Sequence, residues 1–106
     1  MRLPKAVQIA GITYKVEKKQ DGDGGSFNIA KQLITVGVKT QRDDRIFQIF
    51  LHEVFEVLLI ERRLRLTNSD NQFCFILSHQ DMENFAGDIA TVILPLVMKG
   101  KVRWIE

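Results

Sequence analysis

The sequence contains few of the residues that build disulfides, cysteine-rich metal sites or membrane spans. Its 106 residues include one cysteine, Cys74, so an internal disulfide and a zinc site made of several cysteines are both excluded, and a reducing compartment is indicated. Charges interrupt the longest apolar segments, so we expect no segment that crosses a bilayer. The first residues lack the apolar stretch of a signal peptide. These absences predict a cytoplasmic protein with no membrane partner.

A large excess of charge of one sign is missing as well. Fifteen Lys and Arg residues stand against thirteen Asp and Glu residues, and the cations are spread along the chain. This balance does not indicate a nucleic-acid partner. The hydrophobic share of 45% and the charged share of 26% are typical of a globular protein. The length suits one hydrophobic core, so we expect a single domain over residues 1–106.

Alternation of apolar with polar residues predicts strands in the first forty residues. The pattern occurs at 7–17, 27–29 and 33–38. The Asp- and Gly-rich run at 20–25 predicts a loop or hairpin turn, because glycine accepts positive φ angles. We therefore expect a three- or four-stranded antiparallel β-meander in this half of the chain.

Apolar residues at helical spacing predict a first helix over residues 46–64. Thr40 and Asp43 have the spacing of a capping box at its start, with Asp in place of the usual Glu. Acidic residues also suit the positive end of a helix dipole.

The second half of the chain is expected to add one short strand and one more helix. Alternation predicts a strand at 72–77, and Ser78 with Asp81 predicts a capped helix that runs to about residue 97. A possible edge strand follows at 102–105. The expected fold class is α+β, with the N-terminal meander packed on a buried first helix and on the second, C-terminal helix.

Three polar residues of the first helix have apolar surroundings. His52 and Glu56 lie one turn apart on one side of the helical wheel, with Glu53 next to them. Glu53 projects among apolar residues, where a carboxylate has a desolvation cost unless it is paired or beside a metal. The opposite side is a conventional core face: Ile46, Phe47, Phe50, Leu51, Val54, Val57 and Leu58.

The spacing of these residues indicates a metal site of the HExxH type. Side chains at i and i+4 on a helix can bind one ion, and His with Glu suits zinc or another divalent transition metal. In HExxH sites the Glu after the first His takes a proton from water and is not a ligand, which predicts Glu53 as general base. Glu56 replaces the second His, and its negative charge lowers the Lewis acidity of the ion. Metal binding is thus a firmer expectation than efficient hydrolysis.

The second histidine of the chain is the candidate third ligand. His79 falls in the first turn of the second helix, on the side that includes Ala86, and Glu83 lies one turn further on. We expect His52, Glu56 and His79 to hold the ion, with Glu83 as fourth ligand, as a partner of His79, or as third ligand in its place. Alternatively, His79 is a half-exposed residue at a helix start.

A second interpretation of the first helix needs no metal. Four charged or titratable residues share one side of it and would form a solvated stripe in which Glu56 pairs with a neighbouring arginine: Arg45, His52, Glu56 and Arg63. Short matches to H-E-x-x-E arise often by chance on Glu-rich helices.

Three segments resemble a known family. They are I-A-G-I-T-Y-K-V at 9–16, L-H-E-V-F-E at 51–56 and L-S-H-Q-D-M-E-N-F-A at 77–86. The layout is similar to that of small zincin-like proteins encoded by phages and prophages, which are relatives of minimal metallopeptidases. In that family the motif is L-H-E-x-x-H and an acidic ligand opens the last helix. Here Glu56 and His79 occupy those two positions, as if the donor types had been exchanged.

The leading hypothesis is a metal-dependent, peptidase-like hydrolase that acts on a peptide or protein. The alternative is a non-catalytic metal-binding or structural or interaction protein encoded by a mobile element. Two features weaken the case for catalysis: Tyr14 is the only further candidate for stabilising an oxyanion, and a chain of 106 residues offers little cleft beyond one sheet edge and the loop at 20–25. The sequence does not predict the oligomeric state.

Overall fold

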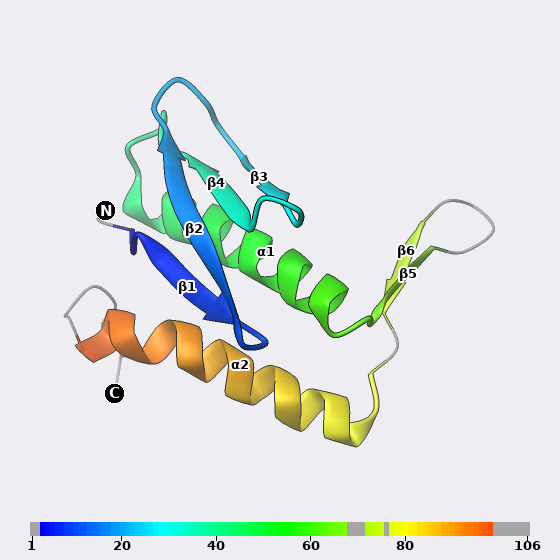
Figure 1. The fold of residues 1–106 in the computed structure, drawn as a ribbon. Coiled ribbons are helices and arrows are strands. Elements are labelled where there is room, and N and C mark those ends of the chain that lie inside the picture. Colours follow the sequence, from blue (N-terminus) through cyan, green and yellow to red (C-terminus); the bar gives the residue numbers. More distant parts are fainter. Residues whose placement is uncertain (1–2, 68–71, 76, 99–106) are drawn as a thin grey trace.

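The protein has an α+β fold in which two helices lie on one side of a small sheet (Figure 1). The computed structural model describes residues 3–67, 72–75 and 77–98. In chain order the elements are β1 (Ala6–Ile9), β2 (Ile12–Lys19), β3 (Gly25–Asn28), β4 (Leu33–Gly37), α1 (Asp43–Glu61), β5 (Arg65–Thr67), β6 (Phe73–Phe75) and α2 (His79–Met98). The expected fold class is confirmed. No helix in the described part of the chain is long and apolar enough to cross a membrane.

The main sheet consists of two hairpins joined through their inner strands. β1 and β2 are antiparallel across a tight turn at Ala10 and Gly11, which have φ angles of 52° and 81°. β3 and β4 are also antiparallel, but β4 pairs with β2 in parallel, which gives the order β1-β2-β4-β3. The sheet is therefore mixed, and the expectation of a wholly antiparallel meander was wrong at the central pair. β3 becomes an edge strand.

The helices cover the inner face of the sheet and form the core with it. α1 packs beneath β3 and β4, and α2 packs against β1 at the opposite edge (Figure 1). The most completely buried residues lie on β1, β2, β4 and α1: Ile9, Tyr14, Ile34, Val36, Ile46, Phe50, Val54, Val57 and Leu58. α2 contributes Val92 and Leu96 to the same core.

The two helices begin differently. α2 has the expected cap, since the Ser78 hydroxyl accepts the Asp81 N–H at 3.1 Å and the Asp81 carboxylate accepts the Ser78 N–H at 3.0 Å. The capping box expected for α1 was wrong. Arg42 occupies the N-cap position with no side-chain cap, and its guanidinium bonds to Asp44 instead.

A two-stranded hairpin connects the helices. Its second strand, β6, lies within the strand expected at 72–77, whereas β5 was not predicted. The possible edge strand at 102–105 lies outside the described residues.

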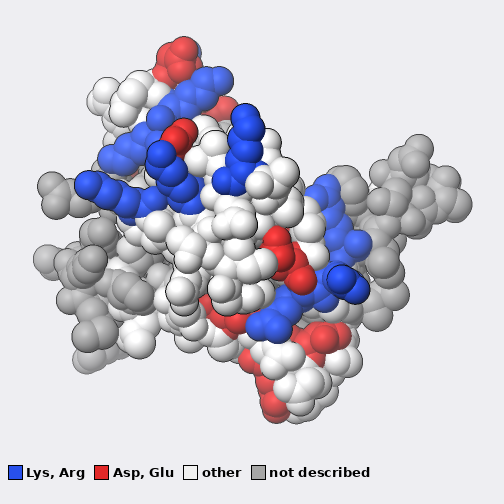
Figure 2. Space-filling model, in the orientation of Figure 1, with Lys and Arg blue, Asp and Glu red and all other residues white. Residues whose placement is uncertain are grey.

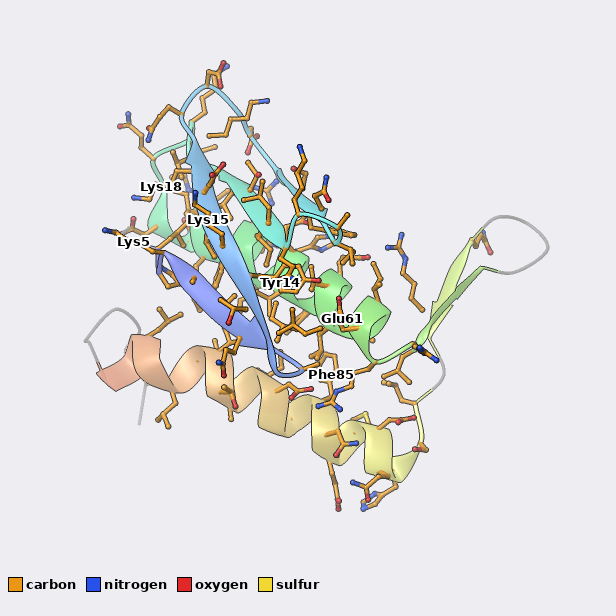
Figure 3. All side chains as sticks on the ribbon, in the orientation of Figure 1. Lys5, Tyr14, Lys15, Lys18, Glu61 and Phe85 are labelled. Atoms are coloured by element: carbon orange, nitrogen blue, oxygen red, sulfur yellow. The ribbon has the colours of Figure 1, made fainter. Side chains whose placement is uncertain are left out.

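Two polar contacts hold the C-terminal end of α1 against the rest of the protein. Tyr14 on β2 is fully buried and donates its hydroxyl to Glu61 Oε1 at 2.6 Å (Figure 3). Arg62, just after α1, donates two hydrogen bonds of 2.9 Å to the Asp88 carboxylate on α2. These contacts fix the last turn of α1, so its register against the sheet is well defined.

Candidate functional site

Glu53 lies on the face of α1 that points to the edge strand of the sheet. Its side chain is only 6% exposed, and it is the one charged residue in the buried part of the described chain. The helical wheel had placed it among apolar residues, so this prediction is confirmed. β3 approaches closely here: a Cβ added to Gly25 would lie 2.7 Å from Glu53 Cγ and 2.9 Å from Ile49 Cγ2. Glycine at position 25 therefore lets the strand cover the carboxylate.

Among the described residues, none forms a hydrogen bond or ion pair with the Glu53 carboxylate, whose oxygens still face the open pocket rather than closed protein interior. Burial raises the pKa of this carboxyl above its usual value; the charge of His52 opposes the rise, and the charge of Glu56 adds to it. A buried carboxylate without a partner is costly to a fold and is often found where a protein needs a proton acceptor.

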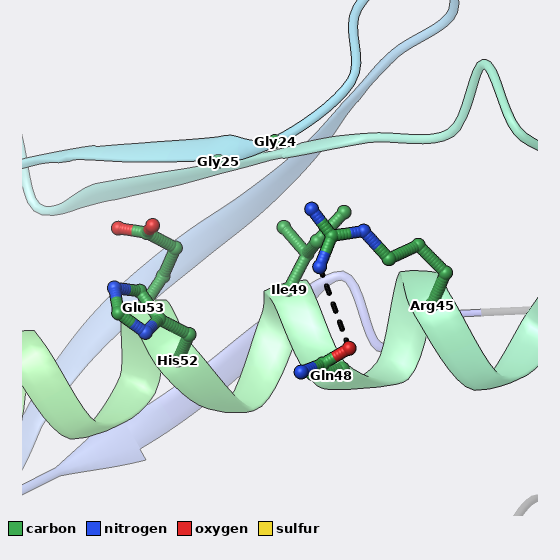
Figure 4. Close-up of a pocket in the computed structure, with 7 residues that line it drawn as sticks. All are labelled: Gly24, Gly25, Arg45, Gln48, Ile49, His52 and Glu53. Atoms are coloured by element: carbon green, nitrogen blue, oxygen red, sulfur yellow. Dashed lines mark hydrogen bonds between the residues drawn. The ribbon is translucent and has the colours of Figure 1, made fainter.

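A pocket of about 370 Å³ opens between α1 and the start of β3 (Figure 4). The Glu53 carboxylate and the Arg45 guanidinium both point from the helix toward the strand, with the Ile49 side chain between them. Its lining is Gly24, Gly25, Arg45, Gln48, Ile49, His52 and Glu53. The pocket therefore combines a buried acid, an exposed histidine and a cation along one side of α1.

His52 and Glu56 lie one turn apart, as the sequence predicts, and face each other across 3.9 Å between Nε2 and Oε1. In a tetrahedral zinc site, two ligand atoms at 2.0–2.2 Å from the ion are about 3.4 Å apart. The side chains must therefore approach each other by about 0.5 Å to bind one ion. His52 is 67% exposed, and Glu56 is 22% exposed.

Glu56 has a second partner. Its Oε2 lies 3.4 Å from the guanidinium of Arg65 on β5, while Oε1 faces His52. An arginine partner for Glu56 is what the metal-free interpretation expects, although that interpretation took the partner from α1 itself. Because each oxygen has its own neighbour, the ion pair leaves Oε1 directed at His52.

His79 does not lie beside His52 and Glu56. Its side chain is 89% exposed at the start of α2 and pairs with Glu83 across 3.0 Å. The side of α2 that was expected to face α1 is turned to solvent at this end, where Met82 is 53% exposed. The helical wheel placed His79 on the side of α2 that faces the core, and this expectation was wrong. The residues of α2 that pack inward are Phe85, Ile89, Val92 and Leu96.

The fit of the site to a divalent ion is therefore partial. Zinc sites normally have at least three protein ligands. Among the described residues, no three His, Cys, Asp or Glu side chains come close enough together to hold an ion. His52 and Glu56 supply two donors of suitable type and spacing, and the described part of the chain adds no third.

Of the residues that line the pocket, only His52 and Glu53 were assigned to the site from the sequence; among the others, Arg45 and Gly25 matter most. Arg45 was placed on the same side of the helix as His52, and this shared side was the available signal. Gly25 gave no signal beyond a turn, because its role depends on the packing of β3 on α1. Tyr14, the candidate for an oxyanion, is bonded to Glu61 two turns beyond the site and does not line the pocket.

Comparison with known proteins gives no relative: no protein-family model, no curated protein and no solved structure matches the chain.

Proposed function

We propose that the chain is a zincin-like protein that binds a divalent transition metal ion, zinc first of all, through His52 and Glu56, and that Glu53 acts beside it as general base in peptide hydrolysis. The observation that carries the proposal is the Glu53 side chain, which belongs to a residue only 6% exposed, has no bonding partner among the described residues, and lies in the same pocket as His52. An accidental motif gives no reason for this carboxylate to be under β3.

The chain's own groups would divide the work as follows. His52 and Glu56 would hold the ion, and His79 or Glu83 stays the proposed third ligand. A bound ion would supply a Lewis acid that acidifies water and polarises a carbonyl group. Glu53 would accept the proton of the attacking water at its carboxylate, and its raised pKa suits a group that later returns the proton to a leaving amine. β3 would exclude bulk water from that carboxylate.

The edge position of β3 supports a peptide as the substrate. Within the described residues β3 pairs only with β4, so the backbone groups along its other side are open beside the pocket. An extended peptide can add to such an edge through main-chain hydrogen bonds. One sheet edge and the loop at 20–25 are the places where the sequence left room for a substrate, and Gly24 and Gly25 of that loop line the pocket.

Metal analysis and peptide cleavage test the proposal together. Protein purified without added metal should bind one zinc ion, His52→Ala should lose it, and Glu53→Gln should keep it while losing cleavage in a peptide screen. The matched control is Glu17→Gln, the same substitution at a carboxylate on β2 that is 49% exposed and lies outside the pocket; it should keep both zinc and cleavage. Wild-type protein that binds no metal would end the proposal. Unchanged cleavage in Glu53→Gln would remove the general base.

His79→Ala and Glu83→Ala identify the third ligand. Loss of zinc in one of them names that residue, because the side chains form one exposed pair and only one needs to reach the ion. Retention in both leaves a two-residue site completed by water or substrate.

A second candidate function is a non-catalytic metal-binding or interaction protein of a mobile element. An apolar groove of about 500 Å³ on the outside of the helices favours it, lined by Phe55 of α1 and by Phe85, Ala86, Ile89, Ala90, Ile93 and Leu94 of α2. Zinc binding without cleavage by the wild-type protein would favour this function over hydrolysis.

A further inference from the structure

The pocket beside Glu53 contains a cation that the proposed chemistry does not use. Arg45 projects from the first turns of α1 into the same pocket as His52 and Glu53, on the side toward Gly24 and Gly25 (Figure 4). Metal binding needs His52 and Glu56, and proton transfer needs Glu53. The Arg45 guanidinium is therefore available to bind a ligand in this pocket.

Arg45 is loosely held compared with other arginines of the protein. Its Nε lies 3.8 Å from the Asp23 carboxylate, and its Nη1 donates to Gln48 at 3.4 Å. Arg62, by contrast, donates two hydrogen bonds of 2.9 Å to Asp88. A guanidinium has five N–H donors and binds carboxylates best with two parallel bonds. Arg45 can therefore bind a ligand carboxylate with only weak contacts to give up.

The position of Arg45 sets how far its ligand group lies from the reacting bond. Arg45 and His52 are seven residues apart, which is nearly two turns, so they share one side of α1 and are separated by about 10 Å along the axis. An extended peptide covers this distance in about three residues. The guanidinium bonds to Gln48 and lies beside Ile49, so it is nearer to Glu53 than its backbone is (Figure 4). The pocket thus suits a peptide with a carboxylate within about three residues of the bond that faces Glu53.

We propose that Arg45 is a specificity residue that selects peptides with an acidic group at this position. The inference rests on the proposed function, because it takes the pocket to be the place where a peptide is bound. Its own observation is the geometry of Arg45, which lies in the same pocket as Glu53 and is held only by contacts of 3.8 and 3.4 Å. Lys and Arg alternate with Asp and Glu over the face of the molecule in Figure 2, so the preference for an acidic group rests on Arg45 alone.

Peptide binding to metal-free Glu53→Gln protein separates this inference from metal chemistry and from turnover. The probes are alanine-based hexapeptides with blocked termini and one Glu or Gln at each position in turn, together with the all-alanine peptide with a free C-terminus. NMR follows the Gly24 and Gly25 amides and the Arg45 side-chain N–H. At one position, Glu peptides should bind at least about tenfold more tightly than their Gln counterparts, because a charged partner strengthens a hydrogen bond to arginine. The free C-terminus distinguishes a terminal carboxylate from an acidic side chain.

Arg45→Gln should abolish the preference, whereas Arg42→Gln should keep it. Arg42 is the matched control because it is a cation three residues earlier, paired with Asp44 and outside the pocket. Circular dichroism checks that both variants fold, as expected for exposed side chains. A preference for Glu that persists in Arg45→Gln, equal binding of Glu and Gln peptides, or no peptide binding at all would overturn the inference. None of these results depends on whether zinc binds to His52.

Discussion

The buried carboxylate of Glu53 should lower the stability of the folded protein, and Glu53→Gln tests this directly. The side chain is 6% exposed, and no other described residue bonds to the carboxylate. Burying a polar group without a hydrogen bond costs about 1–3 kcal/mol, and a charged group costs more than a neutral one. Glutamine has nearly the same shape without the charge. Near neutral pH, we therefore expect the variant to be more stable by an amount on the order of 1–3 kcal/mol.

Urea denaturation as a function of pH measures the effect. Because the pKa of Glu53 is raised in the folded protein, protonation stabilises the wild type. That stabilisation is complete below the ordinary glutamate pKa of 4.5, which applies to the unfolded chain, and is lost as pH rises through the folded pKa. The advantage of glutamine should thus be largest near pH 7 and vanish in acid. Glu17→Gln is the control, since that carboxylate is 49% exposed. A Glu53→Gln protein no more stable than wild type at pH 7 would refute the reasoning.

Two further predictions concern the packing around the site. Tyr14→Phe should lower the free energy of unfolding by about 1–3 kcal/mol, because Glu61 loses its buried donor. Burial raises the pKa of Tyr14 above 10.0, so the stability that this hydrogen bond contributes should be lost as pH rises beyond that value. An unchanged urea midpoint for Tyr14→Phe at neutral pH would contradict the predicted contribution of the bond. Gly25→Ala should cost about 1–3 kcal/mol through overpacking against Glu53 and weaken peptide binding, whereas Ser26→Ala, on exposed β3 backbone, should change neither. Equal thermal midpoints for these two variants would refute the close contact.

The positions of the strands and helices could largely be predicted because each has a clear period in the sequence. α2 begins and ends close to its predicted bounds, and β6 lies inside its predicted strand. The parallel pairing of β2 with β4 could not be predicted, since alternation every two residues looks the same in either orientation. β5 was missed because three residues directly after a cationic helix end give too short a pattern.

The part of the candidate site that lies on α1 alone was predicted correctly from the sequence. The part that requires α1 and α2 to come together was not. The wheel for α1 placed His52 beside Glu56 and identified the burial of Glu53, because helix geometry alone relates them. The rotation of α2 depends on which of its apolar stripes packs on β1. Ile89 and Val92 lie on that stripe, so His79 is turned to solvent.

The ion pair between Glu56 and Arg65 has a consequence for the order in which ligands would bind. With Glu53 ionised, the carboxylates of Glu53, Glu56 and Asp23 face the guanidiniums of Arg45 and Arg65, so these groups together carry one negative charge. Uptake of a divalent cation would leave a surplus of one positive charge beside the pocket. An anionic ligand would then bind more tightly to the loaded site, and by linkage it would tighten the hold on the ion by the same factor. Ion and acidic ligand would thus be cooperative partners in one small site.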